Sequence, residues 1–199
     1  MKLVLASDNK GKLREFGALF ADHGIEVLSQ GSLGVTPCEE PYGTFLENAL
    51  AKARNAAKVT GLPAMADDSG IMAHALITEP GVHSARYSGR KSDDAANNAK
   101  LVERLKPFED KTAHYTCVLV ALRSADDPAP IVCEGCWYGQ ITETPAGDGG
   151  FGYDPYFYLP EKGCTAAELS AEEKNRLSHR GKAMRLLLAE IRERWGVGA

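Results

Sequence analysis

The stretch Leu62-Pro63-Ala64-Met65-Ala66-Asp67-Asp68-Ser69-Gly70 begins as an apolar run and ends in two adjacent carboxylates, a hydroxyl and a glycine. The apolar half predicts a strand that enters the core and ends where the carboxylates begin. Neighbouring carboxylates repel each other, so we expect a positive group to hold them, and a hard divalent cation with oxygen ligands is suitable. The alternative is an exposed turn, since Asp, Ser and Gly all favour turns.

The composition is that of an ordinary globular chain. A length of 199 residues allows one domain, or one core with a smaller lobe. The net charge of -4 and the lack of a basic run argue against a nucleic-acid binder, which needs clustered Lys and Arg. The first apolar run is too short for a secretion signal, no stretch is long enough for a membrane span, and the odd cysteine count favours a reduced compartment. These features predict a cytoplasmic protein that does not enter membranes.

A second candidate site lies near the N-terminus. Residues 2–6 predict a strand, Ser7-Asp8-Asn9-Lys10-Gly11-Lys12 is a polar turn, and Leu13, Phe16, Leu19 and Phe20 follow at helical spacing. A glycine-bearing turn before a helix N-terminus suits an anion, because backbone N–H groups and the helix dipole face the ligand and Lys12 adds a charge. The chain has no Walker motif, so the hypothesis is a phosphate site of another kind, and the alternative is an ordinary strand-to-helix turn.

Capping signals and β-type runs outline the middle of the chain. Thr44-Phe45-Leu46-Glu47 predicts a helix that ends before Gly61, with Asn48 and Lys52 one turn apart, facing either a ligand or solvent. Residues 25–29 and 70–78 predict strands, and Ser92 or Asp93 caps a helix in which Asp93-Asp94 are start-of-helix carboxylates, not ligands. Residues 114–123 and 131–142 predict a hairpin with Asp126-Asp127 at its polar tip, which serves as a control for the pair at 67–68.

The last third carries a glycine-rich loop and two helix starts. Residues 147–152 match G-x-G-x-x-G, but aromatics and Pro155 follow instead of a helix, so the dinucleotide-binding interpretation fails. Phe151 or Tyr153 can stack on a base, with the core as the alternative, which we prefer for Tyr156 and Phe157. Ser170-Ala171-Glu172-Glu173 opens a helical turn containing Lys174, and Ser178-His179-Arg180-Gly181 precedes a terminal helix.

Six blocks together resemble the inosine triphosphate pyrophosphatase family, over almost the whole chain and in the family's order. The blocks are Ser7-Asp8-Asn9-Lys10-Gly11-Lys12, Thr44-Phe45-Leu46-Glu47-Asn48-Ala49, Ala66-Asp67-Asp68-Ser69-Gly70, Ser84-Ala85-Arg86-Tyr87-Ser88-Gly89, Gly150-Phe151-Gly152-Tyr153-Asp154-Pro155 and Ser178-His179-Arg180-Gly181. The resemblance implies an α/β fold, in which a long curved mixed sheet is flanked by helices in two lobes with the active-site cleft between them. It also implies that residues 1–199 form a single pyrophosphatase domain and that the usual assembly is a homodimer.

The activity implied is Mg²⁺-dependent hydrolysis of non-standard purine nucleoside triphosphates (ITP, dITP and XTP) to the monophosphate and pyrophosphate. This reaction cleans the nucleotide pool and keeps deaminated purines out of DNA and RNA. Two alternatives stay open: a pyrophosphatase with another base preference, and a nucleotide-sensing module without turnover. The intact Asp67-Asp68 pair argues against the second.

Site residues follow from the resemblance position by position. Glu39 and Asp68 are similar to the Mg²⁺ ligands, with Glu40 as the alternative to Glu39, and Asp68 also resembles the base that activates water. Asp67 is expected to support the metal through water. The substrate contacts implied are Ser7, Asp8, Asn9, Lys10, Gly11, Lys12, Lys52 and Lys174 for the triphosphate, Phe151, Gly152, Tyr153, Asp154, His179 and Arg180 for the base, and Ser69.

Overall fold

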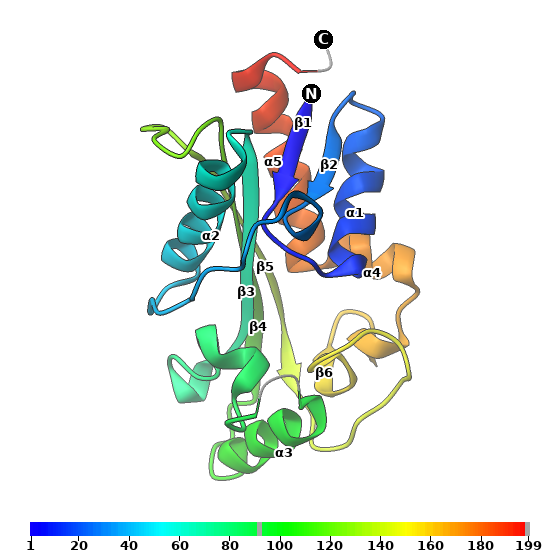
Figure 1. Cartoon of the computed structure of the whole chain (residues 1–199). Coiled ribbons are helices and arrows are strands. Elements are labelled where there is room, and N and C mark those ends of the chain that lie inside the picture. Colours follow the sequence, from blue (N-terminus) through cyan, green and yellow to red (C-terminus); the bar gives the residue numbers. More distant parts are fainter. Residues whose placement is uncertain (91–92, 198–199) are drawn as a thin grey trace. The chain divides into compact units, whose positions relative to one another are not determined.

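The structure, a computed structural model, describes residues 1–90 and 93–197. Within these ranges a seven-stranded sheet has the order β2-β1-β3-β4-β5-β6-β7, with helices around it (Figure 1). The strands are β1 (Lys2–Leu5), β2 (Glu26–Ser29), β3 (Ala64–Ala73), β4 (Thr112–Leu122), β5 (Ile131–Ile141), β6 (Phe157–Leu159) and β7 (Cys164–Thr165). The helices are α1 (Lys10–Ala21), α2 (Phe45–Thr60), α3 (Asp94–Leu105), α4 (Ala171–Leu177) and α5 (His179–Trp195). β1 pairs in parallel with β2 and β3, whereas β6 pairs antiparallel with β5 and β7, so the expected mixed α/β sheet is confirmed.

The chain forms two compact units, each assembled from separate segments. The first contains Met1–Asp68, Val118–Glu134 and the chain from Ala183 onward, and the second contains Ser69–Cys117 and Gly135–Lys182. β3, β4 and β5 each contribute residues to both units. The division matches the two lobes that the resemblance implies.

In the first unit, two parallel crossovers place α1 and α2 on opposite faces of the sheet. The chain passes from β1 through α1 to β2, and then through α2 to β3 on the other side of β1. Because such crossovers are right-handed, reversing the direction across the sheet moves the second helix to the other face. Figure 1 shows β1 and β3 between α2 and α1. Open α/β sheets bind ligands at such a reversal, beside the carboxyl ends of the strands.

The capping signals of α2 and α3 are confirmed. The Thr44 hydroxyl accepts a hydrogen bond from the Glu47 N–H, and Gly61 directly follows the end of α2 with a φ of 67°, in the left-handed region that glycine adopts readily. Asp93 caps α3 by accepting from the Ala96 N–H, while Ser92 lies outside the described residues.

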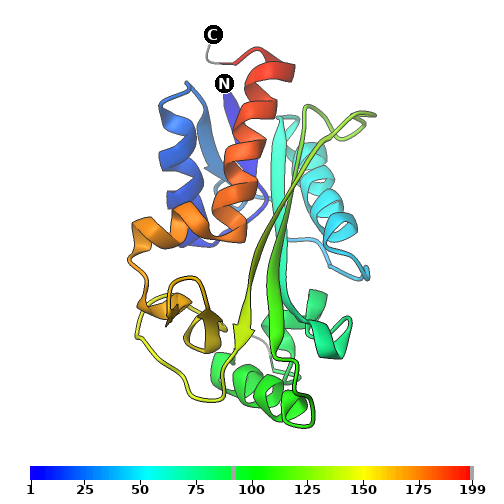
Figure 2. The ribbon, with the colours of Figure 1, turned by 180° about the vertical axis from the view of Figure 1, so that it is seen from behind.

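The predicted hairpin is also present. β4 and β5 run side by side in Figures 1 and 2, and Asp127 holds the polar tip by accepting from the N–H groups of Arg123 and Ala129. Asp126 beside it is exposed, as expected for a solvated turn. The control pair therefore lies in a surface turn, where Asp127 bonds to the backbone of the turn itself.

The prediction that a strand ends at Asp67 and another covers residues 70–78 is wrong. β3 runs without interruption from Ala64 to Ala73, and a short 3-10 turn over His74–Leu76 follows it. Two adjacent carboxylates are tolerated in mid-strand because alternate residues of a strand face opposite sides of the sheet, so each carboxylate finds its own positive partner.

The second unit has an aromatic core. Tyr115 of β4, Trp137 of β5 and Phe157 of β6 pack together with ring centroids 4.8–6.3 Å apart. Leu101 and Leu105 of α3 belong to the same buried cluster, so α3 is fixed to the sheet of this unit. In the part of the chain that the structure describes, no helix combines the length and apolar character needed to cross a membrane.

Candidate active site

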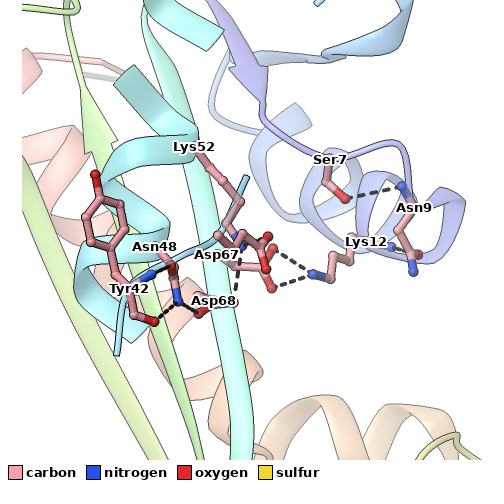
Figure 3. A network of polar contacts seen from close by, with 9 residues as sticks. Ser7, Asn9, Lys12, Tyr42, Asn48, Lys52, Asp67 and Asp68 are labelled. Carbon is pink, nitrogen blue, oxygen red and sulfur yellow. Dashed lines mark hydrogen bonds and ion pairs between the residues drawn. The ribbon is translucent and has the colours of Figure 1, made fainter. Parts of the chain in front are cut away.

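Asp67 and Asp68 contact lysines that come from different helices. The Lys12 Nζ of α1 lies 2.8 Å from both carboxylate oxygens of Asp67. The Lys52 Nζ of α2 lies 3.2 Å from Asp68 Oδ1. Figure 3 shows the two carboxylates reaching in different directions, which is what consecutive strand residues between helices on opposite faces must do. The repulsion expected between the carboxylates is thus relieved by two ammonium groups.

Lys52 and Asn48 surround Asp68. Lys52 Nζ also lies 2.8 Å from Glu40 Oε1, so it bridges two carboxylates. Asn48 Nδ2 donates to Asp68 Oδ2 at 3.3 Å and to the Tyr42 carbonyl at 3.2 Å, while the Tyr42 N–H donates back to Asn48 Oδ1 at 3.1 Å (Figure 3). The prediction that Asn48 and Lys52 share a face of α2 is confirmed, and that face is turned toward Asp68.

This cluster is shielded from water, and the shielding sets its electrostatics. The side chains of Lys52 and Asp68 are each 14% exposed. Burial raises the pKa of Asp68, Lys52 opposes that rise, and the negative Glu40 adds to it. Burial alone would lower the pKa of Lys52, but Asp68, Asp67 and Glu40 outweigh it and raise that pKa. Asp68 is therefore a carboxylate whose basicity is raised by burial and by Glu40, and whose charge is partly balanced by Lys52.

The donor set around Asp68 fits a magnesium ion. No cluster of three His, Cys, Asp or Glu side chains suited to a metal occurs in residues 1–90 and 93–197. Mg²⁺ usually needs only one or two carboxylates, because water and substrate phosphates complete its shell. Asp68 and Glu40 face a common cation already, the Lys52 ammonium, whereas Glu39 is exposed. The residues present therefore suit the cation, with Glu40 better placed than Glu39.

The turn before α1 is held by its own side chains. The Ser7 hydroxyl accepts from the Asn9 N–H at 3.2 Å, and Asn9 Oδ1 caps α1 by accepting from the Lys12 N–H at 3.0 Å. Asp8 points elsewhere: its oxygens accept from the Gly31 N–H at 2.8 Å and from Gln30 Nε2 at 3.1 Å. Lys10 is exposed at the first position of α1, and Gly11 follows it.

A second cluster, in the second unit, gathers the residues predicted for the base. Asp154, 3% exposed, accepts from the Phe151 N–H at 2.7 Å and pairs with Lys174. Lys174 Nζ lies 4.5 Å and the Arg180 guanidinium 5.7 Å from the centroid of the Phe151 ring, which is 59% exposed. Lys174, expected among the triphosphate contacts, thus lies with the residues expected to bind the base.

Of the remaining predicted residues, His179 and Tyr153 are buried and Ser69 is half-buried. His179, 7% exposed, stacks on Tyr115 with centroids 4.6 Å apart and planes 6° apart. Tyr153 is 5% exposed and its hydroxyl donates to the Ser84 carbonyl at 2.8 Å, in keeping with the core alternative, while Ser69 lies half-buried in β3 directly after Asp68. Tyr115, which the sequence analysis did not single out, is 8% exposed and belongs to the aromatic core of the second unit.

Comparisons with known proteins agree over nearly the whole chain. A sequence model of the Ham1 family matches residues 3–190. A dITP/XTP pyrophosphatase from Ralstonia nicotianae is 58% identical over 194 residues, and one from Neisseria meningitidis is 59% identical over 191, with 96% of both chains covered in each case. Among solved structures, a HAM1 protein from Coxiella burnetii aligns with a TM-score of 0.94 at 46% identity, covering 97% of this chain and 99% of that one.

Proposed function

Because this chain belongs to the Ham1 family, we propose that it hydrolyses non-standard purine nucleoside triphosphates (dITP, ITP and XTP) to the monophosphate and pyrophosphate. Relatives 55–59% identical over nearly the full chain carry the name dITP/XTP pyrophosphatase. The chain is thus a nucleoside triphosphate pyrophosphatase that removes deaminated purine nucleotides from the pool.

One observation carries the proposal: two adjacent carboxylates on one strand, each paired with a lysine from a different helix. Cleavage of a triphosphate needs carboxylates to bind a metal and activate water, and cations to neutralise phosphate charge. Asp67 and Asp68 supply the first kind of group, and Lys12 and Lys52 supply the second.

The metal proposed is Mg²⁺, held by Asp68 together with Glu39 or Glu40. Its contribution when bound is to neutralise charge along the triphosphate. The bridge that Lys52 makes between Glu40 and Asp68 favours Glu40. Asp67 supports the site by fixing Lys12.

The chain's own residues supply the remaining steps. Asp68 accepts the proton of the attacking water, a role that its raised basicity suits. The N–H groups at the start of α1, with Ser7, Asn9, Lys10, Gly11 and Lys12, bind the phosphate chain, and Lys52 adds a second ammonium. Asp8 orders this turn by bonding to Gly31.

The base is held in the second cluster. Phe151 offers an exposed ring for stacking, with Gly152 and Tyr153 shaping the backbone beside it. Arg180 donates hydrogen bonds only, and His179 can donate from one ring nitrogen, which suits the 6-oxo group of hypoxanthine or xanthine better than the 6-amino group of adenine. Asp154 and Lys174 fix the loop that carries Phe151.

Several further features are proposed on the resemblance. Residues 1–199 act as one pyrophosphatase domain, in keeping with three strands that contribute to both units. The protein works in the cytoplasm as a homodimer on free nucleotides and binds neither nucleic acid nor membranes. Light scattering on the purified protein tests the dimer.

The decisive experiment measures pyrophosphate release from ITP, dITP, XTP, GTP, ATP and dTTP, with and without Mg²⁺. We expect ITP, dITP and XTP to be cleaved far faster than the others, and only with the metal. Preference for a pyrimidine triphosphate would replace the proposed substrate class. Tight binding of ITP without pyrophosphate release would favour a nucleotide sensor.

A further inference from the structure

The first turns of α3 hold the backbone of Gly152 at two points. The Gly152 N–H donates to Asp94 Oδ2 at 2.8 Å, and the Gly152 carbonyl accepts from Asn98 Nδ2 at 2.8 Å. The contacts join residues 58 and 54 positions apart in the sequence, all within the second unit. Asp94 and Asn98 lie one helical turn apart, so they face the loop together. The loop carrying Phe151 is therefore tied to a helix.

The Asn98 side chain has one possible orientation. Its Nδ2 also donates to the Asp94 carbonyl at 2.8 Å, so both amide hydrogens point at carbonyl oxygens, and a flipped amide would set oxygen against oxygen. Asn98 is 5% exposed, and its Oδ1 is buried with no hydrogen-bond partner in the described part of the chain. A buried carbonyl without a partner is costly. An apolar side chain would avoid that cost. We therefore attribute the amide at position 98 to the two carbonyl groups, of Asp94 and Gly152, that its NH₂ group binds.

Other contacts fix the same loop. Gly150 and Gly152 have φ values of 73° and 63°, in the left-handed region that side-chain-bearing residues rarely adopt. The Phe151 N–H between them is bound by Asp154. The backbone on both sides of Phe151 is thus ordered, although the Phe151 ring itself is 59% exposed. An exposed aromatic ring on a fixed backbone is suited to receiving a flat ligand.

We propose that Asp94 and Asn98 are positioning residues for base recognition, holding Gly152 so that the Phe151 ring is set for a purine. The inference rests on the proposed function, because it assigns a determinant of substrate affinity at the same site. Asp94 was expected to act only as a start-of-helix carboxylate. Neither residue touches the substrate, and both act through the Phe151 loop.

Hydrogen exchange in the ligand-free protein tests, without any assay of function, whether Asp94 and Asn98 hold the backbone of Gly152; we call this pair of contacts the clamp. In Asp94→Ala and Asn98→Ala we expect the amides of residues 151–153 to exchange about tenfold faster or more than in the parent protein. Asp94→Asn keeps an acceptor oxygen and should restore slow exchange. Asn97→Ala is the matched control, because Asn97 is as buried and lies on the same helix but accepts from the Ser88 N–H and makes no hydrogen bond to Gly152 in the described part of the chain. Unchanged exchange in both alanine variants overturns the clamp.

Steady-state kinetics test the positioning role. Asn98→Ala should raise KM for ITP about tenfold with a smaller change in kcat, while inhibition by inorganic pyrophosphate, which lacks a base, stays as in the parent. If Asn98 acts through Phe151, then Asn98→Ala adds little in a Phe151→Ala background. The proposal would be refuted if the effects of Asn98→Ala and Phe151→Ala on KM simply multiplied in the double variant. It would also be refuted if Asn97→Ala raised KM as much as Asn98→Ala does.

The two failures are distinguishable. A parent protein that does not cleave ITP contradicts the proposed function, while hydrogen exchange still decides whether the loop is clamped. A parent protein that cleaves ITP, with Asn98→Ala behaving like Asn97→Ala, leaves the function intact and overturns only the positioning role.

Discussion

The amide variants of the two adjacent carboxylates should differ in their effects. Asp67→Asn should lower the stability of the fold, whereas Asp68→Asn should lower turnover without lowering stability. Asp67 is 3% exposed with both oxygens 2.8 Å from Lys12, so Asp67→Asn removes a hydrogen-bonded charge pair from the interior. A hydrogen bond to a charged group contributes about 1.5–3 kcal/mol. In a chain of this size each kcal/mol shifts the unfolding midpoint by about 2–4 °C, so the expected fall is about 3–12 °C.

Asp68→Asn should leave the midpoint unchanged or raise it. Burial raises the pKa of Asp68, so the folded state binds a proton there more readily than the unfolded chain does. The ionised carboxylate therefore opposes folding at neutral pH. This unfavourable contribution to the free energy of folding is absent at acid pH, and it grows as pH rises from the pKa of Asp68 in the unfolded chain through its higher pKa in the folded protein. An amide carries no such charge, and Lys52 keeps Glu40 at 2.8 Å. Turnover of ITP should nevertheless fall by about 10²–10⁴, since an amide cannot accept a proton from water.

The assay pairs thermal unfolding in EDTA at neutral pH with pyrophosphate release in Mg²⁺. Asp126→Asn, at the exposed tip of the hairpin, is the control and should change neither quantity. A fall in midpoint for Asp68→Asn as large as that for Asp67→Asn would show that Asp68 is a structural ion-pair partner. Retention of most turnover in Asp68→Asn would remove it from the catalytic role.

Three further outcomes are expected. Glu40→Gln should weaken Mg²⁺ binding, measured by calorimetry with nucleotide present, while Glu39→Gln should change it little. If Glu39→Gln weakens Mg²⁺ binding more than Glu40→Gln does, the metal ligand is the exposed Glu39. Lys12→Ala should weaken the binding of ITP far more than the binding of the product IMP in competition assays. Equal losses of affinity for ITP and IMP would mean that Lys12 does not bind the phosphate chain. Arg180→Ala should lose ITP cleavage strongly while residual ATP cleavage hardly falls, because the proposed partner of Arg180 is a 6-oxo group, which adenine lacks. Equal losses of activity on the two substrates would contradict a role of Arg180 in base recognition.

Local signals in the sequence predicted the elements that local interactions stabilise. Thr44 and Gly61 marked both ends of α2 because capping is decided within a few residues. The polar tip at Asp126-Asp127 identified the hairpin for the same reason. The six sequence blocks that resemble the family predicted the fold class, and one of these blocks contains Asp67 and Asp68.

Contacts between distant residues could not be predicted in this way. β3 was expected to end at Asp67, yet it continues because Lys12, 55 residues away, and Lys52, 16 residues from Asp68, neutralise the two charges. Asp94 was expected to serve only its own helix, and its partner Gly152 lies 58 positions further on. Which of Glu39 and Glu40 faces Lys52 depends on the path of a loop that has no sequence signal.

The tether between Asp8 and Gly31 affects the entropy of ligand binding. A flexible phosphate loop must lose conformational freedom when it closes on its ligand, at about 1–2 kcal/mol for each backbone residue that is ordered. Here both Asp8 oxygens are engaged by Gly31 and Gln30, and Ser7 and Asn9 bond to the same turn. That freedom is therefore lost when the protein folds, not when the nucleotide arrives. We therefore expect affinity for the triphosphate to depend also on Gly31, which lies outside the predicted site but holds Asp8 in it, because a side chain at position 31 would collide with Asp8.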